Sequence, residues 1–310
     1  MIDTTELPLS TPSDVIIHAL AMRMRPNIGV VIGGEGADEL LCGYTLPHWC
    51  IEDYRLSSLA AAGEWPGTSV TERVFLHGLQ QRYGRSEFSG PLDHYFAANS
   101  NVPGSVKSAL LNDSILQAID GDSAMFGFYA AEFEQAGDCG TADDSWLRRA
   151  AIVLHRINLE SLLARLDTAT MLASLEARVP YTDFRLVEFA FSLPTAFRID
   201  VDPNEPNPLL PAVELDRRGS LRSKKLLRHI ASRRMPERAA QRRKASFPTP
   251  VAGWLSGPWE RWASERLQNS RFGREVFRKS TLDEMADNVG AVGMWLWPVL
   301  NLLNWGDRVL

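Results

Sequence analysis

The spacing of apolar side chains predicts helices along most of the chain and one short strand. Apolar residues recur on one helical face over residues 15–24, after a serine, threonine and proline at 10–12 that are typical of a helix start. Pro26 ends this predicted helix. The run Val30–Ile32 is β-branched and apolar without alternation, which indicates a short strand buried on both faces of a parallel sheet.

The second half of the chain predicts a long helix followed by a shorter one. Leucine, isoleucine and methionine follow helical spacing over residues 154–171, so Asp167, Thr170 and Glu176 are expected on or near this helix. Asp183 is the predicted N-cap of the shorter helix. We interpret the acids and arginines along the long helix as ion pairs that fix its position, with catalysis as the alternative.

These elements indicate an α/β fold that is predominantly helical. Residues 1–55 have the order helix, strand, turn, helix, which is half of a doubly wound unit around a parallel sheet. No other segment has a convincing pattern for a neighbouring strand, so we predict an incomplete sheet whose strand has an open edge. Residues 56–145 are expected to form a helical insert, and residues 146–310 a large helical remainder.

The turn that follows the strand is the candidate ligand site. Gly33, Gly34 and Gly36 let the backbone turn sharply and approach a ligand with no Cβ in the way. A turn from the carboxyl end of a parallel strand into a helix is where α/β sheets bind ligands. The carboxylates of Glu35 and Asp38 suggest a cation such as Mg²⁺ that bridges to phosphate oxygens. The alternative is an ordinary turn whose acids only complement the helix dipole.

Composition restricts the class of protein. At 310 residues and 45% apolar content, the chain can bury a large core as one big domain or two modest ones. The net charge of −5 argues against a general nucleic-acid-binding protein. We find neither a membrane-spanning apolar run nor a signal-peptide pattern, and the three cysteines suit neither a disulfide framework nor a zinc site. We therefore expect a cytoplasmic protein that does not enter the membrane.

Basic residues gather in one part of the helical remainder. Twelve of the 33 lysines and arginines lie between Arg217 and Lys244, in a chain that is acidic overall. One interpretation is the solvated face of a helix over residues 223–234. The other concerns Lys244, which runs into a proline-rich turn with an aromatic anchor at residues 245–250. A lysine held by such a turn can neutralise polyphosphate as a point charge.

Three stretches together resemble one family. Residues 34–44 resemble the S-G-E-G-x-D-E-L-x-x-G-Y motif of glutamine-dependent asparagine synthetases. Residues 167–183 resemble that family's D-x-x-[ST]-M-x-x-S-L-E-x-R-V-P-[FY]-x-D motif. Residues 224–247 are similar to its K-x-L-L-R … P … R-x-K-x-x-F segment. The resemblance extends over residues 10–310, and residues 56–145 are unmatched.

The resemblance implies ATP-dependent amide formation on a pyrophosphate-loop sheet of the adenine nucleotide α-hydrolase-like type. In this family a carboxylate is adenylated with release of pyrophosphate, and ammonia or an amine then attacks the acyl group. By resemblance, Asp38 would help to hold Mg²⁺, Lys244 would contact the pyrophosphate, and Glu35 would lie beside the acyl-adenylate as a catalytic base. These roles agree with the cations and the metal that phosphoryl charge requires.

The same resemblance implies that Gly33, Gly34 and Gly36 lie against the ATP, beside Glu35. Two features of the family are absent from the 310 residues, namely the glutaminase domain and the S-G-G-x-D-S pyrophosphate loop. Gly33 replaces the family's serine. Pro8 stands where asparagine synthetases have an arginine for the substrate carboxylate, which argues against aspartate as the substrate.

We therefore interpret the chain as the C-terminal part of an amide-forming ligase. A separate chain is expected to carry the other half, with the pyrophosphate loop, the glutaminase domain or both. The expected substrate is a small-molecule or peptide carboxylate. The alternative is a degenerate homologue that acts as a binding or regulatory subunit without ATP chemistry. Nucleic-acid binding through the basic cluster is the weakest interpretation, because the surrounding protein is acidic.

Overall fold

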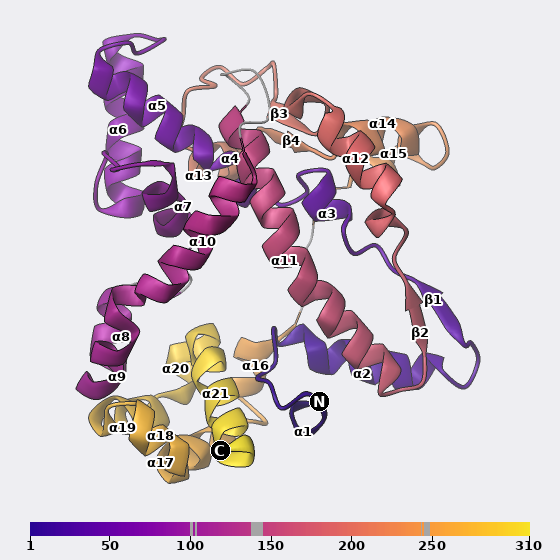
Figure 1. Ribbon diagram of the computed structural model, residues 1–310, viewed down its shortest axis with the longest axis vertical. Helices are drawn as coiled ribbons and strands as arrows, with labels where there is room; N and C mark the ends of the chain where they lie inside the picture. The colour runs from indigo at the N-terminus through magenta and orange to yellow at the C-terminus, as the bar shows by residue number, and fades with distance from the viewer. Residues whose placement is uncertain (100–101, 103, 138–144, 243, 245–248) are drawn as a thin grey trace.

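The computed structural model describes residues 1–99, 102, 104–137, 145–242, 244 and 249–310. Helices dominate these residues, and the strands form two small two-stranded sheets (Figure 1). The prediction of a predominantly helical α/β protein is confirmed at this level. None of the helices within the described ranges is both long enough and apolar enough to cross a membrane.

The N-terminal part has the predicted order of helix, strand, turn and helix. Its second helix begins one position later than the sequence suggests, because Pro12 is the N-cap residue and Ser13 the first helical one. The Asp14 carboxylate accepts hydrogen bonds from the N–H groups of Ser10 at 2.9 Å and Thr11 at 3.2 Å. The elements of this part are α1 (Ile2–Thr5), α2 (Ser13–Met24), β1 (Val30–Ile32), α3 (Ala37–Leu40), α4 (Thr45–Trp49) and α5 (Ile51–Ala62).

Strand β1 pairs with a strand that the sequence pattern did not reveal. β2 (Glu176–Arg178) runs parallel to β1, and Gly33 N–H donates to Arg178 O at 2.7 Å. The expectation that no neighbouring segment exists is therefore wrong, and so is the placement of Glu176 on or near the long helix. β2 escapes detection because it contains a single apolar residue. In the part of the chain that the structure describes, the other edge of β1 pairs with no strand.

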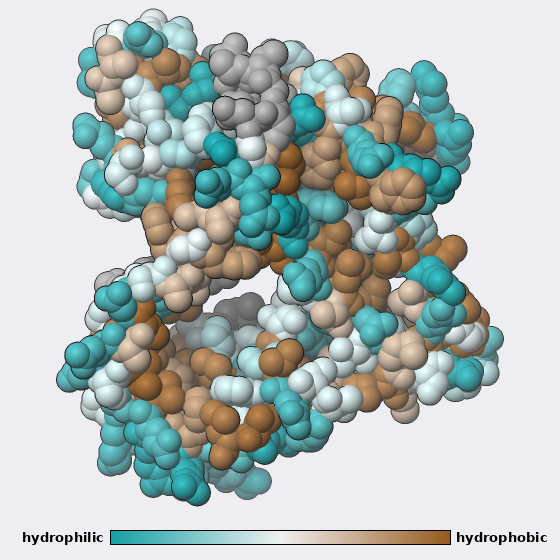
Figure 2. Space-filling view, in the orientation of Figure 1, coloured by the Kyte–Doolittle hydropathy of each residue, from teal (hydrophilic) through white to brown (hydrophobic). Residues whose placement is uncertain are grey.

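The burial of β1 also corrects the sequence prediction. Val30 is 51% exposed and Ile32 is 78% exposed, whereas Val31 packs against Ala21 and Leu175. The described residues cover one face of the strand only, so burial on both faces is wrong. Apolar surface is visible at the lower right of Figure 2, where Figure 1 places α2 and β1. Other apolar side chains are exposed on α2, before β1 and at the end of the long helix: Val15, Leu20, Met22, Ile28, Met171 and Leu172.

The long helix α11 (Ser145–Met171) crosses the middle of the molecule (Figure 1). It confirms the helix predicted over residues 154–171 and carries Asp167 and Thr170, as expected. Helices α2, α3, α4, α5 and α10 all pack against it. After α11 the chain turns through Ser174, whose φ is 55°, and enters β2. α11 is thus the element that connects the N-terminal turn with the rest of the fold.

The helical insert packs on one side of α11 around aromatic side chains. Phe75 and Leu79 form one cluster with Leu56, and Tyr95 and Phe133 form another. Its elements are α6 (Ser69–Tyr83), α7 (Pro91–Asn99), α8 (Gly104–Leu110), α9 (Asp113–Ile119), η1 (Asp120–Asp122) and α10 (Ser123–Gln135).

The segment after β2 forms the upper right of Figure 1. Asp183 caps α12 as predicted, since its carboxylate accepts a hydrogen bond from Arg185 N–H at 2.9 Å. The helix expected over residues 223–234 is α14, which begins after Lys224, a residue with a positive φ of 53°. The elements are η2 (Pro180–Thr182), α12 (Phe184–Ser192), η3 (Thr195–Phe197), β3 (Ile199–Val201), α13 (Ala212–Arg218), β4 (Leu221–Ser223), α14 (Lys225–Ser232) and α15 (Glu237–Ala240). β3 and β4 are antiparallel.

The C-terminal helices enclose an extensive apolar cluster of their own at the lower left of Figure 1. The segment before α2 is tied to them, because Leu9 N–H donates to Asn301 Oδ1 at 3.1 Å and Asn301 Nδ2 donates to Leu9 O at 2.8 Å. The elements are α16 (Val251–Leu255), α17 (Glu260–Asn269), α18 (Arg271–Val276), α19 (Lys279–Asp287), α20 (Val289–Val292), η4 (Gly293–Trp295) and α21 (Leu296–Val309).

Candidate functional site

Asp38 lies between two lysines that come from a distant part of the chain. Lys224 Nζ is 2.7 Å from Asp38 Oδ1, and Lys244 Nζ is 3.0 Å from Asp38 Oδ2. Burial raises the pKa of Asp38, but Lys224 and Lys244 together outweigh burial and lower this pKa below its ordinary value. Asp38 is therefore a carboxylate at neutral pH, and the structure brings two of the predicted site residues, Asp38 and Lys244, into contact.

Two local features hold Lys224 against Asp38. The N–H of Lys224 donates to Leu41 O at 3.1 Å, which anchors the start of α14 to the end of α3. At Gly43 a Cβ atom would lie 1.8 Å from Asp38 Oδ1 and 2.3 Å from Lys224 Cε. Only glycine at this position leaves room for the ion pair.

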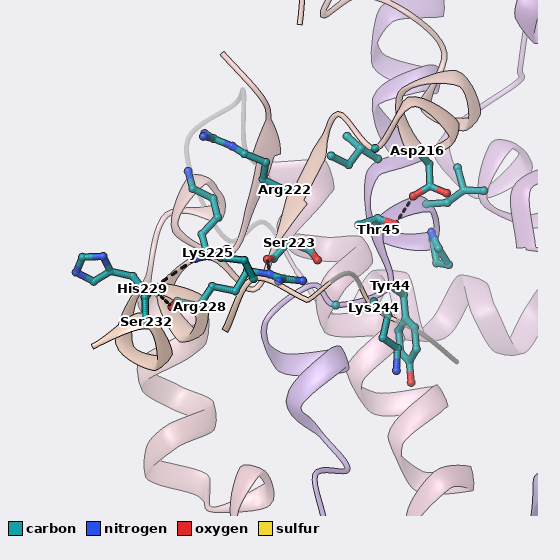
Figure 3. Close-up of a pocket in the computed structure, with 16 residues that line it drawn as sticks. Tyr44, Thr45, Asp216, Arg222, Ser223, Lys225, Arg228, His229, Ser232 and Lys244 are labelled. Atoms are coloured by element: carbon teal, nitrogen blue, oxygen red, sulfur yellow. Dashed lines mark hydrogen bonds between the residues drawn. The ribbon is translucent and has the colours of Figure 1, made fainter. Parts of the chain in front are cut away.

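Tyr44 links the ion pair to the long helix. The Nζ of Lys244 lies 5.6 Å from the centroid of the Tyr44 ring. Figure 3 shows the two side chains next to each other. The Tyr44 hydroxyl donates to Glu39 Oε1 at 2.7 Å, and Asn158 Nδ2 on α11 donates to the same oxygen at 3.0 Å. Burial and the neighbouring Glu39 carboxylate raise the pKa of Tyr44 well above its ordinary value. Tyr44 thus remains protonated and keeps its hydrogen bond to Glu39.

Glu35 faces a different partner from Asp38. Its Oε1 is 3.9 Å from Arg165 Nη2 on α11, a loose ion pair. A Cβ at Gly33 would lie 2.6 Å from Glu35 Oε2, so the absent side chain at position 33 lets Glu35 fold back over the turn. In the part of the chain that the structure describes, no hydrogen bond or ion pair joins Glu35 to Lys244, and the turn that carries Asp38 connects these two predicted catalytic residues.

The glycines of the turn have distinct environments. Gly36 has a φ of 92° at the start of α3, and a Cβ there would lie 3.2 Å from Tyr181 Cβ. A Cβ at Gly34 would meet nothing within 4 Å, so its backbone faces open space. Gly36 is therefore required by the fold, whereas Gly34 leaves the backbone accessible to a ligand.

A cavity of about 760 Å³ opens beside Lys244, which lines it (Figure 3) and pairs with Asp38. Basic side chains predominate among the charged groups of its wall. Arg222 and Lys225 both form ion pairs with Asp200. Lys244 lies at the end of the cavity nearest Asp38, which is its own ion-pair partner. The basic residues that line it are Arg222, Lys225, Arg228, His229 and Lys244. A cavity with this charge suits an anionic ligand such as a polyphosphate.

The described residues contain no group of three or more histidine, cysteine or acidic side chains that could hold a metal by themselves. Asp38 is a single carboxylate with cations on both oxygens. Magnesium at phosphate sites uses one or two carboxylates together with phosphate oxygens and water. Asp38 fits the first of these ligands, provided that the lysines shift to the phosphates.

Sequence reasoning missed three residues of this site. Lys224 stands first in the K-x-L-L-R segment, which is the signal that could have identified it. Gly43 belongs to the quoted Gly-Tyr pair, but only the structure shows what its missing Cβ avoids. Arg165 precedes the second motif by two positions and was interpreted as a structural ion-pair residue. The turn expected to hold Lys244 includes residues 245–248, which lie outside the described residues.

Comparison with protein families identifies the family of this chain. The family model described as asparagine synthase matches residues 1–307. The chain belongs to the asparagine synthase family. The match includes residues 56–145, which the motif comparison left unmatched.

Two curated relatives show how much of such a protein is present. The chain is similar to asparagine synthetase [glutamine-hydrolyzing] 1 of Bacillus subtilis, with 24% identity over 96% of this chain and 43% of the relative. It is also similar to a putative asparagine synthetase [glutamine-hydrolyzing] of Mycobacterium tuberculosis, with 26% identity over 96% of this chain and 42% of the relative. The chain thus spans less than half the length of these asparagine synthase family members. No solved structure matches it significantly.

Proposed function

We propose that this chain forms one half of the ATP site of an amide-forming ligase. The observation that carries the proposal is the contact of Asp38 with Lys244, across 206 positions, beside a second lysine. In the proposed reaction a carboxylate oxygen attacks the α-phosphorus of ATP and the bond to the leaving pyrophosphate breaks. An amine or ammonia then attacks the acyl carbon, AMP leaves, and an amide remains.

The two lysines would act on the leaving group. Lys224 and Lys244 neutralise Asp38 in the described state. With nucleotide present, both ammonium groups would stabilise negative charge on the departing pyrophosphate, since preformed cations favour the transition state. Asp38 would then hold Mg²⁺ through a carboxylate oxygen, and the ion would supply further charge neutralisation to the phosphates.

Glu35 would accept the proton of the attacking amine. It lies in the same turn as Asp38 but outside the lysine pair, and among the described residues its one ion-pair partner is Arg165, at 3.9 Å. A carboxylate that is free of close cations can act as a general base. Gly34, whose backbone faces open space, and Gly33 and Gly36 would lie against the nucleotide.

A second polypeptide is part of the proposal. We propose that a separate chain supplies the S-G-G-x-D-S pyrophosphate loop, with or without a glutaminase domain, and completes a doubly wound sheet of the adenine nucleotide α-hydrolase-like type. The uncovered apolar side chains of β1 and α2, and the edge of β1 that has no partner in the described residues, support this docking position. The acyl substrate would be a small-molecule or peptide carboxylate.

The proposed location is the cytoplasm. Cys50 is a buried thiol whose Sγ donates to Pro47 O at 3.3 Å, and burial, followed by Asp53, raises its pKa to about 12. An inert, reduced thiol of this kind is usual in reducing compartments.

The second candidate is a binding or regulatory subunit without ATP chemistry. One observation favours it: lysines occupy both oxygens of Asp38, so a metal must displace cations from the carboxylate before it can bind. The two candidates differ in whether the lysines matter for turnover.

The experiment measures pyrophosphate release by this chain co-expressed with the reading frame from its own genome that carries the S-G-G-x-D-S loop. Lys244→Ala should lower the rate by about a hundredfold or more, while Arg238→Ala, which removes an exposed charge on α15, should leave it within about twofold. Glu35→Gln should slow amide formation and affect ATP–pyrophosphate exchange much less. Equal rates for Lys244→Ala and wild type in folded proteins would favour the second candidate.

A further inference from the structure

A second cavity, of about 680 Å³, lies on the insert side of Tyr44. Side chains of the helical insert form one wall, α11 forms another, and residues in and beside α4 complete the lining. The α11 wall is largely aliphatic and includes Ile157 and Leu162. The other lining side chains include the charged Arg82 and four tyrosines: Tyr44, Tyr83, Tyr95 and Tyr129.

The polar groups of this cavity are largely engaged within the protein. The Tyr83 hydroxyl donates a hydrogen bond to Asp53 Oδ2 at 3.1 Å. Because the hydroxyl is engaged in this way, the ring is the part of Tyr83 that is available to a ligand. Tyr95 is buried and packs its ring at 5.0 Å from that of Phe133 and at 5.7 Å from that of Tyr129. A rigid, mostly apolar and aromatic cavity of this kind is typical of sites for organic ligands.

The cavity is adjacent to the candidate site, and Tyr44 lies between the two. Tyr44 lines both cavities, and the centroid of its ring lies 5.6 Å from Lys244 Nζ. Asn158 lines the second cavity and binds Glu39, the same carboxylate that Tyr44 binds. Ser161, also in the wall, is one helical turn before Arg165, the partner of Glu35. The cavity therefore ends beside the residues assigned to the reaction.

We infer that this cavity binds the body of the acyl substrate, and that this body is apolar or aromatic. The inference rests on the proposed function, which requires a carboxylate beside Glu35 and Lys244. A cavity of this volume accommodates a drug-sized group, whereas a four-carbon amino acid would leave most of it empty. The substrate class is thus an arylalkyl or long aliphatic carboxylic acid, or a peptide that presents such a side chain next to its reacting carboxylate.

Binding of phenylbutyrate to the full chain tests this assignment, with butyrate and aspartate as controls that lack the apolar body. Ligand-detected NMR titrations should show binding of phenylbutyrate about tenfold tighter than that of either control. Ser161→Trp places a large side chain in the cavity from an exposed position of α11, and should weaken phenylbutyrate binding about tenfold. Ala164→Trp adds the same side chain at an exposed position of the same helix outside the cavity, and should leave binding unchanged.

The position of the bound ring is tested by a benzophenone analogue of phenylbutyrate. On irradiation it should cross-link to the peptides that contain Tyr129 and Ile157, and excess phenylbutyrate should prevent this labelling. Cross-links confined to the exposed apolar surface near Val30 and Ile32, or phenylbutyrate affinity unchanged by Ser161→Trp, would overturn the inference.

The same measurements separate this inference from the proposed function. If phenylbutyrate binds as expected but the assembled complex never releases pyrophosphate, the proposed function fails and the cavity assignment stands. If pyrophosphate release depends on Lys244 but Ser161→Trp does not change the affinity for phenylbutyrate, the cavity assignment fails and the proposed function stands.

Discussion

The Nζ of Lys244 lies 3.0 Å from Oδ2 of Asp38, although 206 positions separate the two residues. The contact joins the residue assigned to the metal with the residue assigned to pyrophosphate. Lys224 approaches the other oxygen of the same carboxylate at 2.7 Å. The charges that would act on ATP are therefore preassembled, and in the described state the Asp38 carboxylate offsets one of the two ammonium charges.

The space around this ion pair depends on Gly43. In Gly43→Ala the new methyl group would overlap Asp38 and Lys224, so we expect a loss of about 1–3 kcal/mol in the free energy of unfolding. Gly34→Ala is the matched control, since a Cβ there meets nothing within 4 Å and should change stability by no more than about 0.5 kcal/mol. Urea unfolding of both variants provides the comparison. Equal stability of the two would show that the pair can move away from Gly43 without cost.

Lys224 and its neighbour Lys225 provide a second matched test. Lys224 contacts Asp38, whereas Lys225 Nζ contacts Ala196 O and Asp200. In the assembled complex, Lys224→Met should lower kcat/KM for pyrophosphate release by about a hundredfold. Lys225→Met should lower it only severalfold, because Arg222 continues to pair with Asp200. A larger effect at Lys225 than at Lys224 would mean that the phosphates lie deeper in the cavity than Asp38.

His48 should make stability depend on pH. It is buried, and burial lowers its pKa from 6.5 to about 4, with the nearby Arg198 acting in the same direction. As pH falls from 6.5 to 4, His48 becomes protonated in the unfolded chain but stays neutral in the folded chain. The free energy of unfolding therefore decreases over that range and does not depend on His48 above it. The full contribution is roughly 3 kcal/mol.

His48→Asn removes the titrating group and keeps a donor for Tyr44 O, which the ring now contacts at 2.8 Å. The difference in unfolding free energy between wild type and variant, measured from pH 8 to pH 4, isolates His48 from Asp53 and His94, whose pKa values are also shifted. A difference that does not change with pH would contradict a neutral, buried His48.

The edge of β1 gives a prediction that needs no knowledge of the substrate. Gly33 N–H points to β2, so by the alternation of a parallel ladder the N–H groups of Val30 and Ile32 point to the other edge. In the isolated chain these two amides should exchange rapidly with solvent. When the chain carrying the pyrophosphate loop is added, they should become protected, while Gly33 is protected in both states and serves as the internal control. Slow exchange at Val30 and Ile32 in the monomeric chain would show that this edge is already covered.

The sequence predicted the helical architecture and the turn that follows the strand, because glycines and helix caps act locally. The cap at Asp183 and the positive φ of Gly36 are examples. It did not predict β2, whose single apolar residue gives no alternation, or the exposure of Ile32, since an apolar run looks the same whether or not another layer covers it. β-Propensity signals depend on what packs against the strand.

The candidate site was predictable only in part. The resemblance pointed to Asp38 and Lys244 separately, but no local pattern specifies that they touch. That contact depends on how β4 and α14 lie against the end of α3, where Lys224 N–H meets Leu41 O. The K-x-L-L-R segment marks Lys224 as a candidate, but no local pattern specifies its contact with Asp38 or its left-handed backbone.

The central claim is that this chain holds one half of an ATP site. Calorimetric titration with Mg-ATP tests it most directly, first on the chain alone and then on its complex with the chain that carries the S-G-G-x-D-S loop. We predict no binding at micromolar concentrations for the chain alone and clear micromolar binding for the complex, lost in Lys244→Ala. Tight binding of Mg-ATP to the isolated chain, unaffected by Lys244→Ala, would contradict the account.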